Sequence, residues 1–357
     1  MSERNTSIDI AKGIGIILVV FGHNWIIAHD HGELFRIIFS FHMPLFFFLS
    51  GAVLHQETGF KDFLAFKIDA LLKPFFVVLS VWGLARIVWS GIDARGYFLG
   101  MLYGTGSTIE WVPLWYLPHL FLAIIFAWII LRLMHRLRPG MLLPSLSIII
   151  LLALGIIMTQ QFAGMDTQKF ESLNLVLGNR QHNFPGLPWS LDLAGVSTAF
   201  ILLGYVMHEH VMRFRFQPWI FEIALLLFAA LHFFFDETID LNMRQYGNWW
   251  VSTAQALLGI YLVLSLSSCL QYAGKPGKVL AYLGTSSLFI MIFHSWIEWK
   301  VFGLLSRVST YAYLNASLAF VAGLLLPLLL LMLVKKNKFL HSLLLPRTHV
   351  PKVRGST

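Results

Sequence analysis

Long apolar stretches alternate with short polar segments along the whole chain. A helix needs about 20 predominantly apolar residues to cross the hydrocarbon core of a bilayer. Stretches of about that length, with few or no charges, cover residues 11–29, 36–54, 72–90, 112–131, 141–159, 189–208, 218–235, 248–270, 279–300 and 310–334. The pattern predicts an all-α fold: a polytopic integral membrane helical bundle of about ten transmembrane helices.

Composition and charge agree with a membrane protein and orient it. Hydrophobic residues make up 57% of the chain and charged residues 12%, which is far more apolar than an average soluble domain. If the N-terminus lies in the cytoplasm and the spans alternate, most of the 26 Lys and Arg residues fall in cytoplasmic segments. The positive-inside rule therefore predicts that both termini are cytoplasmic. The net charge of +8 is then an orientation signal, and no nucleic-acid partner is expected.

The chain reads as one membrane domain, residues 1–335, followed by a basic cytoplasmic tail, residues 336–357, that lies near anionic lipid. The first apolar stretch lacks a convincing signal-peptide cleavage site and contains His23 and Asn24, so it is expected to remain as a span. The single cysteine, Cys269, excludes a disulfide within the chain and a cysteine metal cluster.

Polar residues inside the predicted spans gather at one depth. In the predicted orientation, the outer parts of the spans contain His23, His42, His119, Asp192, His232, His294 and Glu298. Titratable groups in a bilayer are costly and usually face a cavity or one another. The distribution predicts a cavity that opens outward. The histidines come singly from different helices, without paired-ligand spacing, so no metal is expected.

Several of these residues have two interpretations. His119 and His232 are more simply explained by packing than by ligand binding. Asp192 follows a Pro-Trp-Ser sequence, and either caps the start of its helix or binds ligand hydroxyls. Glu298 follows His294 by four residues, so the two side chains share a helix face and can pair.

Lys12 and His23 are eleven residues apart at the two ends of an otherwise apolar segment. On one helix they would lie within about 20° of each other and about 16.5 Å apart along the axis. A lysine at the membrane edge can bind an anionic group, and a neutral histidine in a low-dielectric site can act as a general base. Lys12 can also be a snorkelling lysine, and Asp9 either orients it or caps the helix start.

Two motifs resemble the start of acyltransferase family 3, a family of membrane proteins. They are Asp9-Ile-Ala-Lys12-Gly with His23 eleven residues after the lysine, and Ser40-Phe-His42-Met-Pro44-Leu-Phe-Phe-Phe-Leu-Ser50-Gly51. Further segments fit in order: Leu114-Trp115-Tyr116-Leu117, Pro188-Trp189-Ser190-Leu-Asp192, Leu203-Gly204-Tyr205, and Leu283-Gly284-Thr285-Ser286-Ser287-Leu288 through His294. The Pro-Trp-Ser-Leu-Asp element is similar to the fucose 4-O-acetylase-like branch.

The resemblance implies acyl transfer from a cytoplasmic acyl-coenzyme A to a glycan hydroxyl, by a multi-pass protein of the bacterial inner membrane. The expected product is an acetylated exopolysaccharide, O-antigen or lipid-linked glycan. The family motif associated with coenzyme binding and catalysis maps onto Lys12 and His23. Many members carry an Arg-x-x-Arg pair after the second span, whereas this chain has Lys67 and Lys73 with Asp69 between them. A lysine binds phosphate as a point charge, without the bidentate fork of arginine.

Together these observations predict an O-acetyltransferase in which Lys12 holds the phosphates of acetyl-coenzyme A and His23 acts as the base, or is itself acylated. The predicted catalytic residues are His23, His42 and Asn24; the coenzyme-binding residues are Lys12, Asp9, Lys67, Lys73 and Ser50; the acceptor-binding residues are Trp115, Asp192, His294 and Glu298. Candidate oxyanion donors are Asn24, Ser50, His42 and Trp115. The expected partners are acyl-coenzyme A, a saccharide acceptor and membrane lipids.

Two other classes of function fit parts of the pattern. A multi-span transporter of acylated saccharides would also place polar residues at middle to outer depth. Against it stand the absence of an evident internal repeat and of paired Gly- or Pro-broken helices in corresponding halves. A membrane scaffold without activity would leave the polar cavity without a purpose.

Replacing Lys12 by alanine tests the coenzyme-binding role. We expect Lys12→Ala to raise the KM for acetyl-coenzyme A, because the variant loses the cation that attracts the phosphates. Steady-state kinetics with each substrate varied in turn measures this. A raised KM for the acceptor with an unchanged KM for acetyl-coenzyme A would contradict the role.

Overall fold

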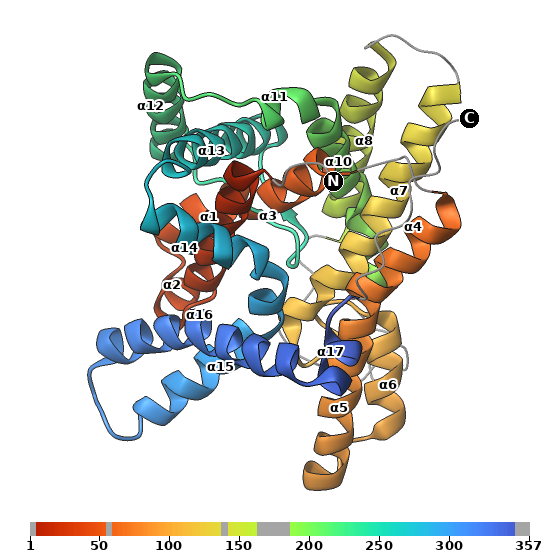
Figure 1. Ribbon diagram of the computed structural model, residues 1–357, viewed down its shortest axis with the longest axis vertical. Helices are drawn as coiled ribbons and strands as arrows, with labels where there is room; N and C mark the ends of the chain where they lie inside the picture. Colours follow the sequence, from red (N-terminus) through yellow and green to blue (C-terminus); the bar gives the residue numbers. More distant parts are fainter. Residues whose placement is uncertain (1–4, 55–58, 137–141, 163–185, 347–357) are drawn as a thin grey trace. The chain divides into compact units, whose positions relative to one another are not determined.

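The computed structural model describes residues 5–54, 59–136, 142–162 and 186–346, and almost all of this part of the chain is helical (Figure 1). The longer helices are α1 (Thr6–Gly22), α3 (Glu33–Ala52), α5 (Lys73–Ser90), α7 (Tyr116–Arg136), α8 (Leu142–Gln161), α10 (Ala194–Val206), α12 (Pro218–Phe234), α13 (Trp249–Leu270), α14 (Lys275–Thr285), α15 (Ser287–Leu305) and α16 (Ala312–Lys336). The all-α prediction is confirmed.

Short elements connect these helices. They are α2 (Trp25–Asp30), α4 (Phe60–Lys67), the π-helical turn η1 (Ile68–Leu72), α6 (Ala94–Tyr103), the 3-10 helices η2 (Val112–Trp115) and η3 (Pro188–Leu193), α11 (His208–Met212) and α17 (Lys338–Leu344). Two strands of two residues each, β1 (Ile239–Asp240) and β2 (Gln245–Tyr246), form a small hairpin before α13.

Each of the ten predicted stretches contains a helix. Within the described ranges, 7 helical segments are long and apolar enough to cross a membrane: Glu33–Ala52, Phe60–Ser90, Val112–Met134, Pro188–Val206, Trp249–Leu270, Ser287–Leu305 and Ala312–Lys336. These segments support an integral membrane protein. The number of ten spans and the cytoplasmic side of the termini remain predictions.

Two stretches that hydropathy predicts as continuous are broken. The stretch 11–29 divides because α1 ends at Gly22 and α2 begins at Trp25; between them Asn24 has extended backbone angles, φ −60° and ψ 141°. The stretch 279–300 divides at Ser286, between α14 and α15. An average over an apolar window carries no information about such a break. The first break determines where His23 lies.

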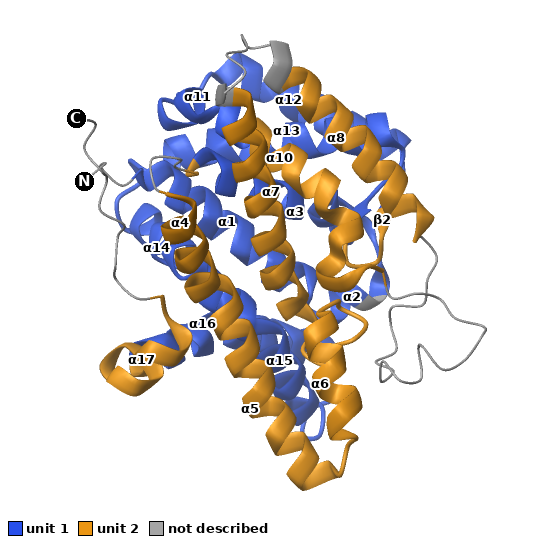
Figure 2. Ribbon diagram, turned by 90° about the vertical axis from the view of Figure 1, so that its right-hand side faces the viewer, with its two compact units in different colours: residues 1–52, 204–240, 246–332 blue, residues 53–203, 241–245, 333–357 orange. Residues whose placement is uncertain are grey.

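The chain forms two compact units, coloured separately in Figure 2. Unit 1 contains Met1–Ala52, Gly204–Asp240 and Tyr246–Met332, and unit 2 contains Val53–Leu203, Leu241–Gln245 and Leu333–Thr357. Each unit is assembled from segments far apart in the sequence, so no change of composition along the chain marks the boundary. The division into a membrane domain and a tail stays a prediction.

In unit 1, α1 packs against α3, α13, α14 and α15. The contact with α14 brings two backbones together, because a Cβ atom at Gly13 would overlap the Leu280 carbonyl and one at Gly284 would overlap the Asp9 carbonyl. Small residues permit such close approach where lipid supplies no hydrophobic drive between helices. This packing holds α1 in place, and therefore the residues at its end.

Unit 2 is built around α7, which packs against η1 and η3. Helices α5 and α6 are joined by the Tyr97 hydroxyl, which donates to the Leu79 carbonyl at 2.8 Å. The indole of Trp82 and the guanidinium of Arg86 both donate to the carboxylate of Glu110, which lies just before η2. These bonds attach the α5–α6 pair to the entry of α7.

The α1–α14 contact predicts a stability effect. Gly284→Ala should lower the free energy of unfolding by about 1–3 kcal/mol, because the new methyl group overlaps a backbone carbonyl that cannot move independently. The melting temperature of the purified protein measures this. Gly303→Ala on α15 is the matched control, because no atom lies within 4 Å of its added Cβ. Equal melting temperatures for the two variants would contradict the packing argument.

Candidate functional site

His23 ends α1 as its C-cap residue, with φ −90° and ψ −3°. Its Nδ1 lies 2.8 Å from the Val19 carbonyl oxygen, one turn earlier. A carbonyl oxygen only accepts hydrogen bonds, so Nδ1 carries the proton that is donated. In the neutral ring Nε2 then keeps its lone pair. The end of α1 therefore presents an imidazole whose Nε2 can act as a base.

Two other predicted histidines are held in the same way. On α3, His42 Nδ1 donates to the Ile38 carbonyl at 2.9 Å. On α15, His294 Nδ1 donates to the Met291 carbonyl at 2.9 Å. Each ring is oriented by its own helix, and each neutral ring keeps an Nε2 lone pair.

The three imidazoles lie along one chain of ring contacts within unit 1. The ring centroids of His23 and His294 are 5.3 Å apart, with an interplanar angle of 80°. Phe39 lies 6.0 Å from His23 and 4.6 Å from His42. Residues from α1, α3 and α15 thus converge, although they are up to 271 positions apart in the chain (294 − 23). The sequence predicted their common depth, and the structure brings them together.

Asn24 joins this cluster to α15 and α16. Its side-chain Nδ2 donates to Glu298 Oε1 at 3.0 Å and to the Ala316 carbonyl at 2.9 Å. Glu298 therefore pairs with Asn24, whereas one interpretation of the sequence was a pairing with His294. Both hydrogens of the Asn24 amide have partners, so this side chain positions Glu298.

Two buried atoms of the cluster have no hydrogen-bond partner among the described residues: His294 Nε2 and Glu298 Oε2. His294 is fully buried and Glu298 is 2% exposed. A buried polar atom without a partner costs about 1–3 kcal/mol. Such atoms are rare in folded proteins and each calls for an explanation, a functional role among them. The cluster is therefore a candidate site for a polar ligand.

The predicted coenzyme-binding residues fall in both units. Asp9 and Lys12 lie on α1 in unit 1, where Asp9 is buried and Lys12 is half-buried. Ser50 lies on α3, and its hydroxyl donates to the Phe46 carbonyl at 2.7 Å. Its only proton is thus directed at its own helix, away from the role of an oxyanion donor.

The other two predicted lysines belong to unit 2 and have partners there. Lys73 Nζ donates to Asp69 Oδ1 at 2.7 Å and to the Leu345 carbonyl at 2.7 Å. The second bond connects the start of α5 to the end of α17. Lys67 Nζ lies 5.5 Å from the ring centroid of Phe63. Lys73 thus donates to a carboxylate and to a backbone carbonyl, which is typical of a structural lysine.

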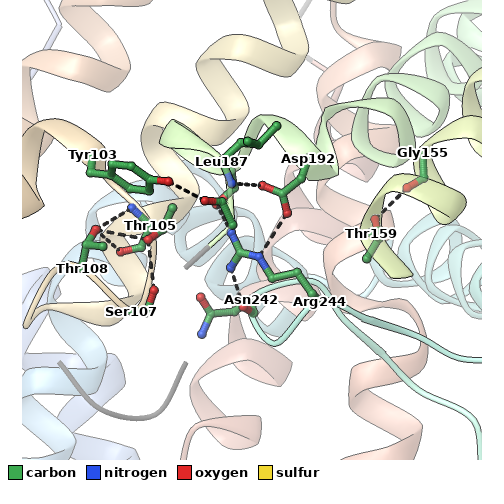
Figure 3. A network of polar contacts seen from close by, with 12 residues as sticks. Tyr103, Thr105, Ser107, Thr108, Gly155, Thr159, Leu187, Asp192, Asn242 and Arg244 are labelled. Carbon is green, nitrogen blue, oxygen red and sulfur yellow. Dashed lines mark hydrogen bonds and ion pairs between the residues drawn. The ribbon is translucent and has the colours of Figure 1, made fainter. Parts of the chain in front are cut away.

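Asp192 takes part in a buried ion pair (Figure 3). Its Oδ1 accepts from the Leu187 backbone N–H at 2.7 Å, and its Oδ2 accepts from Arg244 Nε at 3.1 Å. Both side chains of the ion pair are 0% exposed. The same guanidinium donates to Ser190 Oγ at 3.1 Å and to the Asn242 carbonyl at 2.8 Å. Neither interpretation of Asp192 from the sequence included this partner.

The turn beside Asp192 is strained. Trp189 and Ser190 both have φ of +55°, a left-handed conformation that costs energy for residues other than glycine. Ser190 is held by Arg244, and the Trp189 indole donates to the Leu102 carbonyl at 2.8 Å. Nearby, burial raises the pKa of Tyr103 to about 12 and the Asp192 carboxylate adds to the effect, so its hydroxyl stays a donor, to the Gly186 carbonyl.

Trp115 belongs to unit 2, as Asp192 does. It ends η2, and its ring lies 5.4 Å from that of His119 on α7. His119 is fully buried, and its Nε2 lies 2.6 Å from Ser197 Oγ on α10. These contacts give His119 a packing and hydrogen-bonding role, as its simpler interpretation expected.

The sequence reasoning missed Arg244. A single arginine in a polar loop before α13 is usually solvated, and nothing nearby in the sequence points to Asp192, 52 residues earlier. The signal that was present is the aspartate at a span end, which needs a cation if it is buried. Among the described residues, no group of three or more His, Cys, Asp or Glu side chains is arranged to hold a metal ion.

Comparison with known proteins gives one match. A family model described as an acyltransferase domain matches residues 5–335. No curated protein and no solved structure that was compared with the chain is similar enough to count as a match. The matched residues include parts of both units and every residue of the histidine cluster.

The buried ion pair predicts a strong, non-additive stability effect. Asp192→Asn and Arg244→Gln should each lower the free energy of unfolding by about 3–5 kcal/mol, because each leaves a buried charge without its partner. The double variant should lose much less than the sum. Thermal unfolding of the purified variants measures this. Arg86→Gln is the control, since the partly exposed Arg86–Glu110 pair should contribute no more than about 1 kcal/mol. Additive losses would show that the two charges do not depend on each other.

Proposed function

This chain belongs to the acyltransferase family, matched over residues 5–335, and we propose that it is a membrane O-acetyltransferase with His23 as its general base. The donor is acetyl-coenzyme A on the cytoplasmic side of a bacterial inner membrane. The acceptor is a sugar hydroxyl of an exopolysaccharide, O-antigen or lipid-linked glycan. Both termini are placed in the cytoplasm, and the basic residues 336–357 form a tail beside the membrane.

One observation carries the proposal of His23 as the base: its Nδ1 is committed to the Val19 carbonyl at 2.8 Å, so the neutral ring keeps its lone pair on Nε2. The ring is also 5.3 Å from His294, whose Nε2 has no partner among the described residues. A base must have a defined tautomer and an orientation that the substrate can use. The end of α1 supplies both.

In the proposed reaction, His23 Nε2 takes the proton of the acceptor hydroxyl while the hydroxyl oxygen bonds to the thioester carbonyl carbon. The carbonyl electron pair moves onto its oxygen and gives a tetrahedral oxyanion. When this intermediate collapses, the carbon–sulfur bond breaks and the coenzyme A thiolate leaves. The imidazolium of His23 returns its proton to that sulfur. The products are the O-acetylated sugar, coenzyme A and the neutral histidine.

The other members of the cluster have roles that follow from their contacts. His42 and His294 lie within the ring chain around His23 and help to place the reacting groups. In the neutral form each ring keeps its Nε2 lone pair, which can accept a hydrogen bond from the acceptor. Asn24 acts as a positioning residue, because both of its amide hydrogens are used by Glu298 and Ala316.

Lys12 is the proposed phosphate-binding residue. Lys12 lies on α1, and His23 directly follows the last residue of that helix. Lys12 and His23 are about 16.5 Å apart along the helix axis, a length comparable to the extended arm of the coenzyme. Asp9, one turn earlier, supports it. Lys73 would have to give up Asp69 before it could bind a phosphate, so its role is secondary to that of Lys12. Family membership favours this reaction over the transporter alternative.

Replacing His23 tests the proposal. His23→Gln keeps a polar side chain but removes the base, so acetyl transfer should fall by a factor of about 10²–10⁴. Mass spectrometry of the cell-surface polysaccharide, with protein amounts matched by immunoblot, measures the acetyl content.

The matched control is His232→Gln. His232 is a buried histidine of α12 whose Nδ1 donates to the Phe228 carbonyl at 2.8 Å in the same geometry, but outside the cluster. It should keep acetylation near the wild-type level. Wild-type acetylation in His23→Gln would remove the proposed base.

A further inference from the structure

The junction between α14 and α15 lies against the first turns of α1, within unit 1. A Cβ added at Gly284 would lie 2.8 Å from the Gly13 backbone nitrogen, and one at Gly13 would lie 3.3 Å from the Gly284 nitrogen. Gly284 is followed by Thr285, which ends α14, and by Ser286, the N-cap residue of α15. Lys12 directly precedes Gly13. The start of α15 and the proposed phosphate-binding lysine therefore lie beside the same backbone contact.

The same two segments meet again at the histidine cluster, where the rings of His23 and His294 are 5.3 Å apart. Ten residues separate Gly13 from His23, and ten separate Gly284 from His294. Both segments thus lead from the glycine contact to the histidine pair. A coenzyme that extends from Lys12 to His23 passes the start of α15.

The first turn of α15 attracts anions. This helix has 19 residues, begins at Ser287 and has no acidic residue in its first turn. The first four N–H groups of a helix have no partner inside it, and the aligned peptide dipoles place about half a positive charge at this end. Phosphate groups bind at helix N-termini for these two reasons.

The side chain of Ser286 gives a second, independent indication of a ligand at this place. An N-cap serine usually has extended backbone angles and accepts a hydrogen bond from its helix. Ser286 has φ −100° and ψ 1°, and its hydroxyl makes no such bond. None of the hydrogen bonds found among the described residues involves this hydroxyl, although the residue is only 4% exposed. A buried polar group without a partner calls for an explanation, and a ligand at the helix start supplies one.

We infer that the start of α15 binds a phosphate group of the coenzyme together with Lys12. Backbone N–H groups of the first turn and the Ser286 hydroxyl donate to the phosphate oxygens, and the Lys12 ammonium balances their charge. The arm of the coenzyme then follows α1 and α15 to the pair of His23 and His294. The inference rests on the proposed function, which supplies the coenzyme, and adds a binding element that the lysine motif does not contain.

The headgroup of an anionic lipid offers the same phosphate chemistry. The direction of the two segments favours the coenzyme, because a ligand held by its phosphate at this junction extends along both of them towards the proposed base. His294 lies seven residues after Ser287, which is about 10.5 Å along the axis of α15. The experiment therefore measures coenzyme and lipid binding separately.

Ser287→Asp separates the stability of the helix from phosphate binding. An aspartate in the first turn is favourable for the helix itself, but its charge repels a phosphate bound at the same place. Calorimetry with the full-length protein in phosphatidylcholine nanodiscs measures the Kd for coenzyme A. We expect Ser287→Asp to raise this Kd at least about tenfold. Ser286→Ala should also raise it about tenfold, because it removes a hydrogen bond to a charged group.

Thr310→Asp is the matched control. It adds the same charge to an exposed residue of unit 1 that lies just before α16, beyond the other end of α15. It should bind coenzyme A like the wild type. A melting temperature of Ser287→Asp at or above that of the wild type shows that the variant is folded. Native mass spectrometry measures how much phosphatidylglycerol each variant retains from mixed-lipid nanodiscs.

The outcomes distinguish this inference from the proposed function. A wild-type Kd in both Ser287→Asp and Ser286→Ala, or an equal rise in Thr310→Asp, would overturn the phosphate site and leave the proposed reaction intact. Loss of bound phosphatidylglycerol in Ser287→Asp, with an unchanged Kd for coenzyme A, would assign the site to a lipid headgroup and overturn it as well. If the wild type does not bind coenzyme A, the proposed function itself is contradicted.

Discussion

The hydrogen bond from His23 Nδ1 to the Val19 carbonyl sets the chemistry that unit 1 can perform. It fixes the tautomer of the neutral ring, and it joins two residues one turn apart at the end of α1. The helix that carries this ring packs closely on α14 at Gly13 and Gly284, where two backbones approach without side chains between them.

The ion pair of unit 2 and the cluster around His23 in unit 1 are stabilised in different ways. In unit 2, Asp192 and Arg244 satisfy each other, and the remaining donors of the guanidinium go to Ser190 and a backbone carbonyl. In unit 1, the cluster around His23 keeps two buried atoms, His294 Nε2 and Glu298 Oε2, without partners among the described residues. A satisfied network stabilises a fold, whereas unsatisfied buried groups are usual where a ligand supplies the missing contacts. This contrast is the reason for placing the reaction in unit 1 and a structural role on the ion pair.

Much of this arrangement could be predicted from the sequence, because hydropathy and charge report how each segment meets the membrane. The positions of the helices came from that pattern, and the common depth of His23, His42, His294 and Glu298 stays a prediction from it. The break at Asn24 did not, since a window average takes no account of a side chain that bonds α15 and α16 in place of its own helix. Contacts between segments that are far apart in the sequence could not be predicted either.

Arg244 with Asp192, and Lys73 with the Leu345 carbonyl, are examples of such contacts. Nothing in the local sequence of either cation indicates its partner. The family resemblance identified the segments that carry chemistry, and side-chain geometry then distinguished a histidine with a free lone pair from a lysine that already has a carboxylate. Residues 23, 24 and 25 contact residues 294, 298 and 302 of α15, and these contacts also could be seen only in the coordinates.

The central claim is that an acyl thioester reaches the Nε2 side of His23. A structure of the full-length protein with a non-hydrolysable acetyl-coenzyme A analogue, solved by electron cryomicroscopy, tests it most directly. The account predicts that the phosphates lie at Lys12 and that the acyl carbonyl carbon lies next to His23 Nε2. An analogue bound with its acyl group away from His23, with packed protein between them, would contradict it.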